Sequence, residues 1–151
     1  MKCLVCATDF SEAAAAAERQ AGALARVLGA ELLLLHVASE APLWRETLGT
    51  PAVRAVFEAQ RKWATDTLAE RAVALAAQGV SSRSLLKVGV PWEEIVRVAG
   101  DEGAEMIVMG TQGRTGLDRL LLGSVAERVV RRAPCPVLTV RPDNRDNGGV
   151  S

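Results

Sequence analysis

Three glycines and a serine follow one another at a regular spacing in the second half of the chain. Gly110 is followed by two residues and Gly113, and nine further residues separate Gly113 from Gly123 and Ser124. Glycine has no Cβ atom, so the backbone at these positions can approach a ligand closely and can adopt positive φ. Ser124 opens a segment with helical periodicity, and the free N–H groups and dipole of a helix N-terminus favour an anion. The spacing therefore predicts a phosphate-binding loop.

This loop matches neither of two common phosphate-binding motifs. A Walker loop requires Gly-Lys-Ser/Thr and the dinucleotide fingerprint requires Gly-x-Gly-x-x-Gly, and the chain contains neither. The amides of Val125 and Ala126 follow Ser124 in the same turn, so backbone groups and a hydroxyl would take the place of a lysine. A glycine-rich turn followed by an ordinary helix cap would have the same spacing, and spacing alone leaves both interpretations open.

Strand and helix patterns alternate along the whole chain. Short apolar segments predict strands at residues 3–7, 32–37, 105–109 and 137–140, and residues 82–88 are predicted as a further strand. Four segments with helical periodicity lie between them, at residues 11–28, 51–79, 92–100 and 124–132. This alternation predicts an α/β fold in which helices cover both faces of a parallel sheet.

The longest helical segment carries apolar residues in steps of three and four. They run from Val53 and Val56 through Trp63 to Leu75. We expect one continuous face of this helix to pack on the sheet, with Trp63 as a packing residue.

The fold class also predicts where a ligand would bind. In a doubly wound sheet, ligands bind beyond the carboxyl ends of the strands, where the strand order reverses. If the first strand is central, residues 8–11 and 110–123 flank that point. Asp9 in the first of these loops either binds a ligand or only forms a turn into the helix, and we favour binding because of the loop that it faces. His36 is interpreted as a structural histidine.

Composition excludes several classes of function. Basic and acidic residues number 18 each and aromatic residues make up 3%, which argues against nucleic acid as the main partner. A single histidine excludes a histidine-rich metal site. Three cysteines, no signal-peptide pattern and no long apolar run predict a cytoplasmic protein without membrane contact. We expect one domain over residues 1–141 and a flexible tail over residues 142–151.

Several motifs of the chain resemble those of the universal stress protein family. They are Thr8-Asp9-Phe10-Ser11, Leu35-His36-Val37, Gly89-Val90-Pro91, Met109-Gly110-Thr111-Gln112-Gly113, Gly123-Ser124-Val125-Ala126-Glu127 and Pro134-Cys135-Pro136-Val137. The glycine spacing is similar to that of the ATP-binding branch of the family. The resemblance implies a Rossmann-like, adenine nucleotide alpha hydrolase-like three-layer sandwich with a five-stranded parallel sheet in the order 3-2-1-4-5.

The resemblance also implies which residues contact the nucleoside. Asp9 matches an acidic residue that contacts the adenosine part, and the backbone of Val37 matches the position that meets the adenine edge. Ala7 stands where ATP-binding relatives often carry proline, which would soften the wall of the adenine pocket. The implied nucleoside residues are Ala7, Thr8, Asp9, Val37, Met109 and Gly110.

A second group of residues is implied for the phosphates. Ala126 stands where some relatives carry a hydroxyl residue, but its amide remains available. The implied phosphate residues are Gly113, Arg114, Gly123, Ser124, Val125 and Ala126. The ligand would be ATP, or ADP or AMP, and Mg²⁺ or Mn²⁺ would be held through the phosphates rather than by protein ligands.

The resemblance implies an ATP-binding regulatory module that acts as a nucleotide-dependent switch on a downstream partner. A slow ATPase and a nucleotide-free dimeric scaffold are the alternatives, and an enzyme is disfavoured because no placed general base is evident beyond Asp9. We also expect a homodimer, because no later strand covers the edge of the fifth strand. That strand comprises Val137, Leu138, Thr139 and Val140.

Overall fold

The chain alternates strands and helices from end to end. The structure is a computed structural model that describes residues 2–39, 50–112 and 122–142. Its elements are β1 (Cys3–Ala7), α1 (Glu12–Leu28), β2 (Glu31–Ser39), α3 (Pro51–Ala77), β3 (Ser82–Gly89), α4 (Pro91–Asp101), β4 (Met106–Gly110), α5 (Ser124–Arg132) and β5 (Val137–Val140). These elements confirm the predicted strands and helices to within a few residues. The expected tail lies almost wholly outside the described residues.

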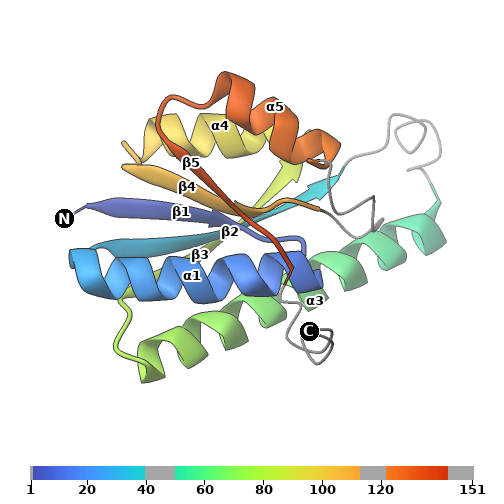
Figure 1. The fold of residues 1–151 in the computed structure, drawn as a ribbon. Coiled ribbons are helices and arrows are strands. Elements are labelled where there is room, and N and C mark those ends of the chain that lie inside the picture. The colour runs from blue at the N-terminus through green and yellow to red at the C-terminus, as the bar shows by residue number, and fades with distance from the viewer. Residues whose placement is uncertain (1, 40–49, 113–121, 143–151) are drawn as a thin grey trace, which may run out of the picture.

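The five strands form one parallel sheet in the order β3-β2-β1-β4-β5. Helices α1 and α3 cover one face, and α4 and α5 cover the other (Figure 1). The predicted three-layer α/β fold and its strand order are therefore confirmed. Central β1 pairs with β2 on one side and β4 on the other, so the strand order reverses between β1 and β4.

The side chains of the sheet divide into two hydrophobic clusters. Val5, Leu33 and Ile107 pack with the residues of α4 and α5 on one face. Leu4 and Leu34 pack with the alanines of α1 and with α3 on the other. All residues of β1 are buried, as expected of a strand covered on both faces. This sandwich holds the carboxyl ends of β1, β2 and β4 at one edge.

Helix α1 has defined signals at both ends. The Ser11 Oγ accepts a hydrogen bond from the Ala14 amide at 3.2 Å and so caps the N-terminus. Gly29 ends the helix in the left-handed conformation, with φ at 63°, and its amide donates to the Ala25 carbonyl. The helix that they bound agrees with the segment 11–28 predicted from the sequence.

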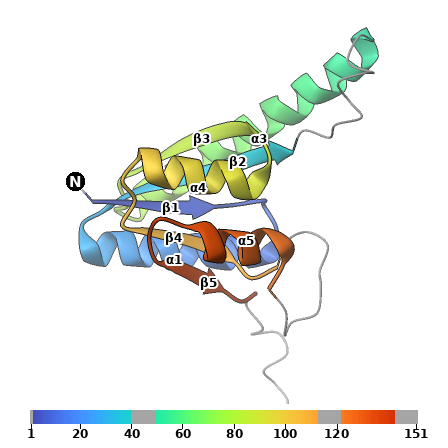
Figure 2. The ribbon, with the colours of Figure 1, turned by 90° about the horizontal axis from the view of Figure 1, so that it is seen from above.

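Helix α3 corrects one expectation. Ala64, Leu68 and Leu75 are buried, but Val56 is 51% and Trp63 is 53% exposed. The 27 residues of α3 span about 40 Å at about 1.5 Å per residue, against about 26 Å for the eight residues of β3. The first half of α3 therefore runs past the sheet (Figure 2), and the prediction that its whole apolar stripe packs on the sheet was wrong.

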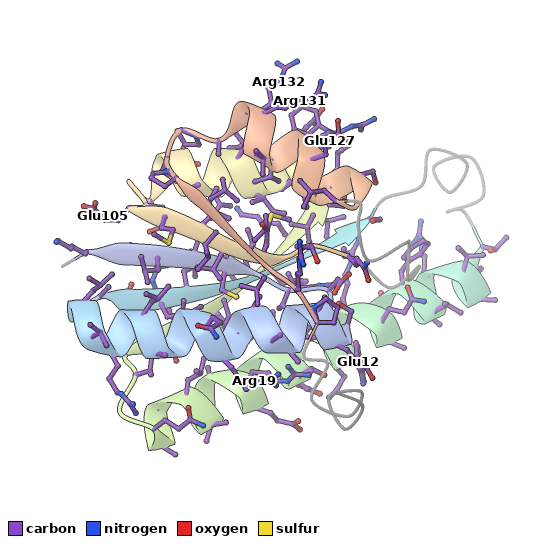
Figure 3. The ribbon with its side chains drawn as sticks, viewed as in Figure 1. Glu12, Arg19, Glu105, Glu127, Arg131 and Arg132 are labelled. Atoms are coloured by element: carbon purple, nitrogen blue, oxygen red, sulfur yellow. The ribbon has the colours of Figure 1, made fainter. Side chains whose placement is uncertain are left out.

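The outer side of α5 is a charged surface. Figure 3 shows Glu127, Arg131 and Arg132 pointing away from the sheet, and Glu127 and Arg131 form an ion pair of 2.8 Å. The acidic residue lies in the first turn and the arginines in the last, which suits the helix dipole. Within the described ranges, no helix is both long and apolar enough to cross a bilayer.

Candidate functional site

A cavity of about 640 Å³ opens at the carboxyl edge of the sheet. Its walls come from the ends of β1, β2 and β4, the first turn of α5 and the first half of α3. It spans the point between β1 and β4 where the strand order reverses. Position and size are those of a small-molecule site in a doubly wound fold.

The cavity brings together most of the site residues that the sequence suggested. Ten of the twelve line it, namely Ala7, Thr8, Asp9, Val37, Met109, Gly110, Gly123, Ser124, Val125 and Ala126. The other two, Gly113 and Arg114, lie outside the described residues. Residues that lie far apart in the sequence therefore line one cavity.

The loop after β1 is held by short-range hydrogen bonds. The Asp9 Oδ1 accepts from the Ser11 amide at 3.0 Å, and the Thr8 Oγ1 accepts from the Phe10 amide at 3.1 Å. Phe10 has a φ of 65°, which is unusual for a non-glycine residue. Asp9 therefore forms the turn that one interpretation of the sequence predicted. The same turn fixes its carboxylate at the cavity wall, so the turn and a ligand contact are compatible.

An aromatic cluster joins this loop to α3. The His36 Nδ1–H donates to the Thr8 carbonyl at 2.8 Å, and the His36 ring lies 4.6 Å from the Phe10 ring, centroid to centroid. Trp63 meets the Phe10 ring edge-on at 5.2 Å. These contacts support the structural interpretation of His36. They also explain how Phe10 is held in a strained backbone conformation.

A buried ion pair lies behind the same cluster. Glu18 of α1 is 6% exposed, and its Oε2 lies 2.6 Å from the Arg71 Nη1 of α3. Burial raises the pKa of Glu18 above its usual value, and the positive charge of Arg71 opposes that rise. The Arg71 guanidinium also lies 5.7 Å from the centroid of the Phe10 ring. The pair therefore links α1, α3 and the loop after β1.

Gly110 is required by packing of the protein against itself. A Cβ atom at this position would lie 2.9 Å from both the carbonyl carbon and the Cβ of Ala13 in α1. The φ of Gly110 is not in the left-handed region. The positive φ that the sequence suggested is therefore wrong, and the close approach of α1 to β4 requires a glycine here whether or not a ligand binds.

The first turn of α5 has no internal acceptor for its amides. Gly123 occupies the N-cap position and offers no side chain, while its own amide donates to the Thr111 carbonyl at 2.6 Å. The first hydrogen bond of the helix runs from the Glu127 amide to the Gly123 carbonyl. Among the described residues, the three amides of residues 124–126 have no acceptor. All three residues line the cavity.

Two further polar groups of the cavity wall are buried without a partner in the described part of the chain. They are the Thr111 Oγ1 and the Gln112 Nε2. Sequence reasoning included both residues in a family motif but gave neither a role. The signal was available, since Thr111 stands two positions after Met109, and alternate residues of a strand share a face.

Sequence reasoning also missed the wall contributed by α3. Phe57, Gln60, Arg61 and Trp63 line the cavity from a helix that was expected only to pack on the sheet. The signal was the length of this helix relative to its neighbouring strands.

The chemistry of the wall suits an oxyanion. The wall residues include hydrogen-bond donors, and the backbone amides of residues 124–126 lie at the positive end of a helix. Across the residues that the structure describes, no group of three or more histidine, cysteine or acidic side chains could hold a metal ion.

A parallel doubly wound sheet with a cavity at its switch point defines the class of doubly wound α/β domains. The family model of the universal stress proteins matches residues 1–141. The chain belongs to the universal stress protein family.

Two curated relatives are similar over nearly their whole length. Universal stress protein MJ0577 of Methanocaldococcus jannaschii is 34% identical, covering 91% of this chain and 93% of the relative. A universal stress protein of Thermus aquaticus is 38% identical, covering 93% of this chain and 98% of the relative.

Solved structures agree with this assignment. A structure of MJ0577 superimposes with a TM-score of 0.82 at 33% identity and covers 95% of this chain and 97% of that chain. A universal stress protein in complex with cAMP gives a TM-score of 0.70 at 25% identity, covering 94% and 98%. The bound cAMP is a property of that relative.

Proposed function

We propose that the protein binds an adenine nucleotide, with ATP as the leading ligand, in the cavity at the carboxyl edge of the sheet. The observation that carries the proposal is the bare first turn of α5, whose three amides and the nearby Thr111 hydroxyl have no acceptor among the described residues. Phosphate oxygens are the acceptors that such a helix terminus suits. The relative solved with cAMP supports adenine as the base.

The two ends of the cavity suit the two ends of a nucleotide. Asp9 and Val37 stand at the ends of β1 and β2, where a carboxylate can accept from ribose hydroxyls and a backbone can meet the adenine edge. Gly123 and Ser124 stand at the α5 end, beside the phosphates. Mg²⁺ or Mn²⁺ would be held through phosphate oxygens, which neutralises charge that the donors alone leave uncompensated.

The biological role that fits this site is a nucleotide-dependent switch. The cavity is walled in part by α3, whose first half stands clear of the sheet and is tied to the nucleotide-facing loop through Phe10 and Trp63. A ligand that orders this loop would alter the surface that α3 presents to a downstream partner.

Nucleotide extraction tests the proposal directly. Purified protein is denatured, and the supernatant is chromatographed for co-purified nucleotide. Nucleotide-free protein is then titrated with ATP, ADP, AMP and cAMP by calorimetry in the presence of Mg²⁺, with GTP as the control for base selectivity. We expect binding of at least one adenine nucleotide. The absence of both co-purified nucleotide and binding heat would refute the proposal.

We further propose that the protein is a homodimer through β5. This strand lies at the end of the sheet order, and Leu138 on it is exposed. An open apolar edge invites pairing with another copy. Sedimentation at micromolar concentration tests the dimer, and a species of 16.0 kDa alone would contradict it.

A further inference from the structure

The first half of α3 forms a wall of the cavity beyond the part of the helix that packs on the sheet. Helix α3 lies wholly within the described residues, and the first buried residue along it is Ala64. Phe57, Gln60 and Arg61 precede Ala64 and line the cavity. The helix is therefore anchored in the core only from Ala64 onward, and the wall before it must be held by other contacts.

The ring of Phe10 contacts α3 close to the point where this wall begins. Trp63 meets the ring edge-on with 5.2 Å between the centroids, and the Arg71 guanidinium lies 5.7 Å from the ring centroid. Arg71 is itself paired with the buried Glu18, and the His36 ring of β2 lies 4.6 Å from the Phe10 ring. Aromatic pairs and cation–π contacts stabilise beyond the apolar area that they bury. Phe10 therefore joins the loop after β1 and the end of β2 to α3.

The backbone of Phe10 indicates that the ring is the reason for this residue. Its φ of 65° lies in the left-handed region, where a bulky side chain is strained and glycine is not. The turn itself is made by neighbouring groups, since the Thr8 Oγ1 accepts from the Phe10 amide and the Asp9 Oδ1 accepts from the Ser11 amide. Glycine would form the same turn without strain, so a phenylalanine here requires a role for its side chain.

The wall formed by α3 lies at the end of the cavity that is farther from α5. Helix α3 packs against β2 and β3, whereas α5 begins beside β4, where the Gly123 amide donates to the Thr111 carbonyl. Figure 2 shows the two helices on opposite sides of β1. The wall therefore stands next to Val37 at the end of β2, where the nucleoside of the proposed ligand would lie.

We propose that Phe10 is a positioning residue of the cavity, whose ring holds the first half of α3 in place as the wall beside the nucleoside. The nucleoside part of this inference rests on the proposed nucleotide-binding function. Phe10 does not need to touch the ligand, because it acts through Trp63 and α3. The strain in its backbone is then offset by the contacts of its ring.

The test compares Phe10→Gly with Phe10→Tyr in the full-length chain. Phe10→Gly removes the ring and suits the φ of 65°, so the turn and the cap of α1 should persist. Hydrogen–deuterium exchange of nucleotide-free protein measures the opening of α3. Calorimetry measures the Kd of adenosine and of ATP in excess Mg²⁺, and thermal denaturation measures the Tm.

We expect Phe10→Gly to speed amide exchange over residues 54–63 at least about tenfold, because an aromatic pair and a cation–π contact are lost together. Residues 68–75, which pack on the sheet, should exchange as in wild type. The Kd of adenosine and that of ATP should both rise about three- to tenfold, since apparent affinity falls with the fraction of molecules that have the wall in place. Phe10→Tyr keeps the ring and should match wild type.

Val98→Ala is the control for a loss of stability alone. Val98 of α4 is 3% exposed, packs in the cluster on the other face of the sheet and does not line the cavity. Removing part of its side chain should lower the Tm. It should leave the exchange of residues 54–63 relative to residues 68–75, and the Kd of adenosine, unchanged.

The other outcomes overturn the inference in distinguishable ways. Wild-type exchange over residues 54–63 in Phe10→Gly would show that the ring does not hold the wall, and faster exchange along the whole of α3 would reduce Phe10 to a core residue. Faster exchange of the wall with an unchanged Kd of adenosine would separate α3 from binding, while the proposed function stands. If wild type binds no adenine nucleotide, the proposed function fails, and the exchange measurement alone decides whether Phe10 holds α3.

Discussion

Helices α1 and α5 begin at the same edge of the sheet, on opposite faces. Their first turns differ in whether a side chain caps them. At α1, the Ser11 side chain caps the Ala14 amide, and Asp9 in turn accepts from the Ser11 amide. At α5, Gly123 provides no side chain, and the amides of the first turn have no acceptor among the described residues. One N-terminus has a side-chain cap, which satisfies the Ala14 amide, and the other has no cap and lies at the cavity.

We interpret this difference as a division of roles, in which the N-terminus of α1 stabilises the fold and the N-terminus of α5 is the proposed ligand-binding end. Free amides at a helix end cost stability unless water, a side chain or a ligand satisfies them. The capped end of α1 fixes the loop after β1 and packs closely on β4 through Ala13 and Gly110. The uncapped end of α5 gives up the stability of a cap and leaves its first-turn amides at the cavity. The comparison therefore predicts that changes at α1 act on stability and changes at α5 act on affinity.

The largest effect is expected at the cap of α5. A Gly123→Val substitution places a branched side chain at a buried position of the cavity wall, in the space that a phosphate needs beside the amides. We expect nucleotide affinity to fall more than about 100-fold, which corresponds to about 2.7 kcal/mol. The φ and ψ of Gly123, −61° and 160°, are accessible to valine, so the fold should persist.

Calorimetry with ATP measures this loss, and circular dichroism checks that the variant is folded. Gly100→Val is a suitable control, because nothing lies within 4 Å of a Cβ at Gly100 and the residue lies outside the cavity wall. A folded Gly123→Val protein with wild-type affinity would show that the open terminus of α5 is not the binding site.

The ion pair between Glu18 of α1 and Arg71 of α3 should give the next largest effect. Arg71→Met leaves Glu18 buried without its cation, which raises the pKa of Glu18 further. We expect a loss of about 2–3 kcal/mol near neutral pH, below the usual cost of breaking a buried pair because the Arg71 side chain is 36% exposed.

The stability lost in Arg71→Met should depend on pH. Because the raised pKa favours the protonated carboxyl in the folded state, the contribution of Glu18 to stability falls as pH rises through that pKa. The gap between wild type and Arg71→Met should therefore be wider at about pH 8 than at about pH 5 in urea unfolding. A gap independent of pH would mean that Arg71 acts through packing on Phe10 alone.

The fold was predictable to a large extent because its signals are local. Apolar segments marked four of the five strands, β3 being the exception, and Ser11 and Gly29 lie at the two ends of α1. The packing of α3 was not predictable from periodicity, since the pattern of apolar residues continues past the point where the sheet ends. Periodicity identifies a helix face, but the partner of that face depends on the lengths of other elements.

The position of the cavity was predictable from the sequence, but the physical roles of its residues were less so. The glycine spacing singled out Gly110 and Gly123, and both line the cavity. At Gly110, however, a glycine is required because Ala13 of α1 leaves no room for a Cβ atom. Strand alternation after Met109 indicated the face that Thr111 shares, but not that its hydroxyl is buried without a partner among the described residues. Hydrogen-bond partners far apart in the chain cannot be counted from sequence.

Gly110 itself provides a prediction on the α1 side of the comparison. In Gly110→Ala, the new Cβ would meet backbone and side-chain atoms of Ala13 at 2.9 Å, so α1 must shift away from β4. We expect a loss of stability of about 1–2 kcal/mol from overpacking. Thermal unfolding with and without ATP tests this: ATP should raise the Tm of both proteins, and an unchanged Tm of the ligand-free variant would contradict the close packing.

The smallest effects are expected from a serine-to-alanine substitution at the start of each helix. These two variants test the comparison most directly, because the chemical change is the same at both positions. Ser11→Ala removes the cap of α1 and should cost about 1 kcal/mol of stability with little change in ATP affinity. Ser124→Ala caps nothing, so stability should stay within about 0.5 kcal/mol, while the Kd of ATP should rise about three- to tenfold through loss of a hydroxyl donor. Urea unfolding measures the stability of both variants, and calorimetry measures their affinity for ATP. If Ser11→Ala weakened binding as much as Ser124→Ala, the two termini would act as one unit, and the division between a capped supporting end and an uncapped binding end would be wrong.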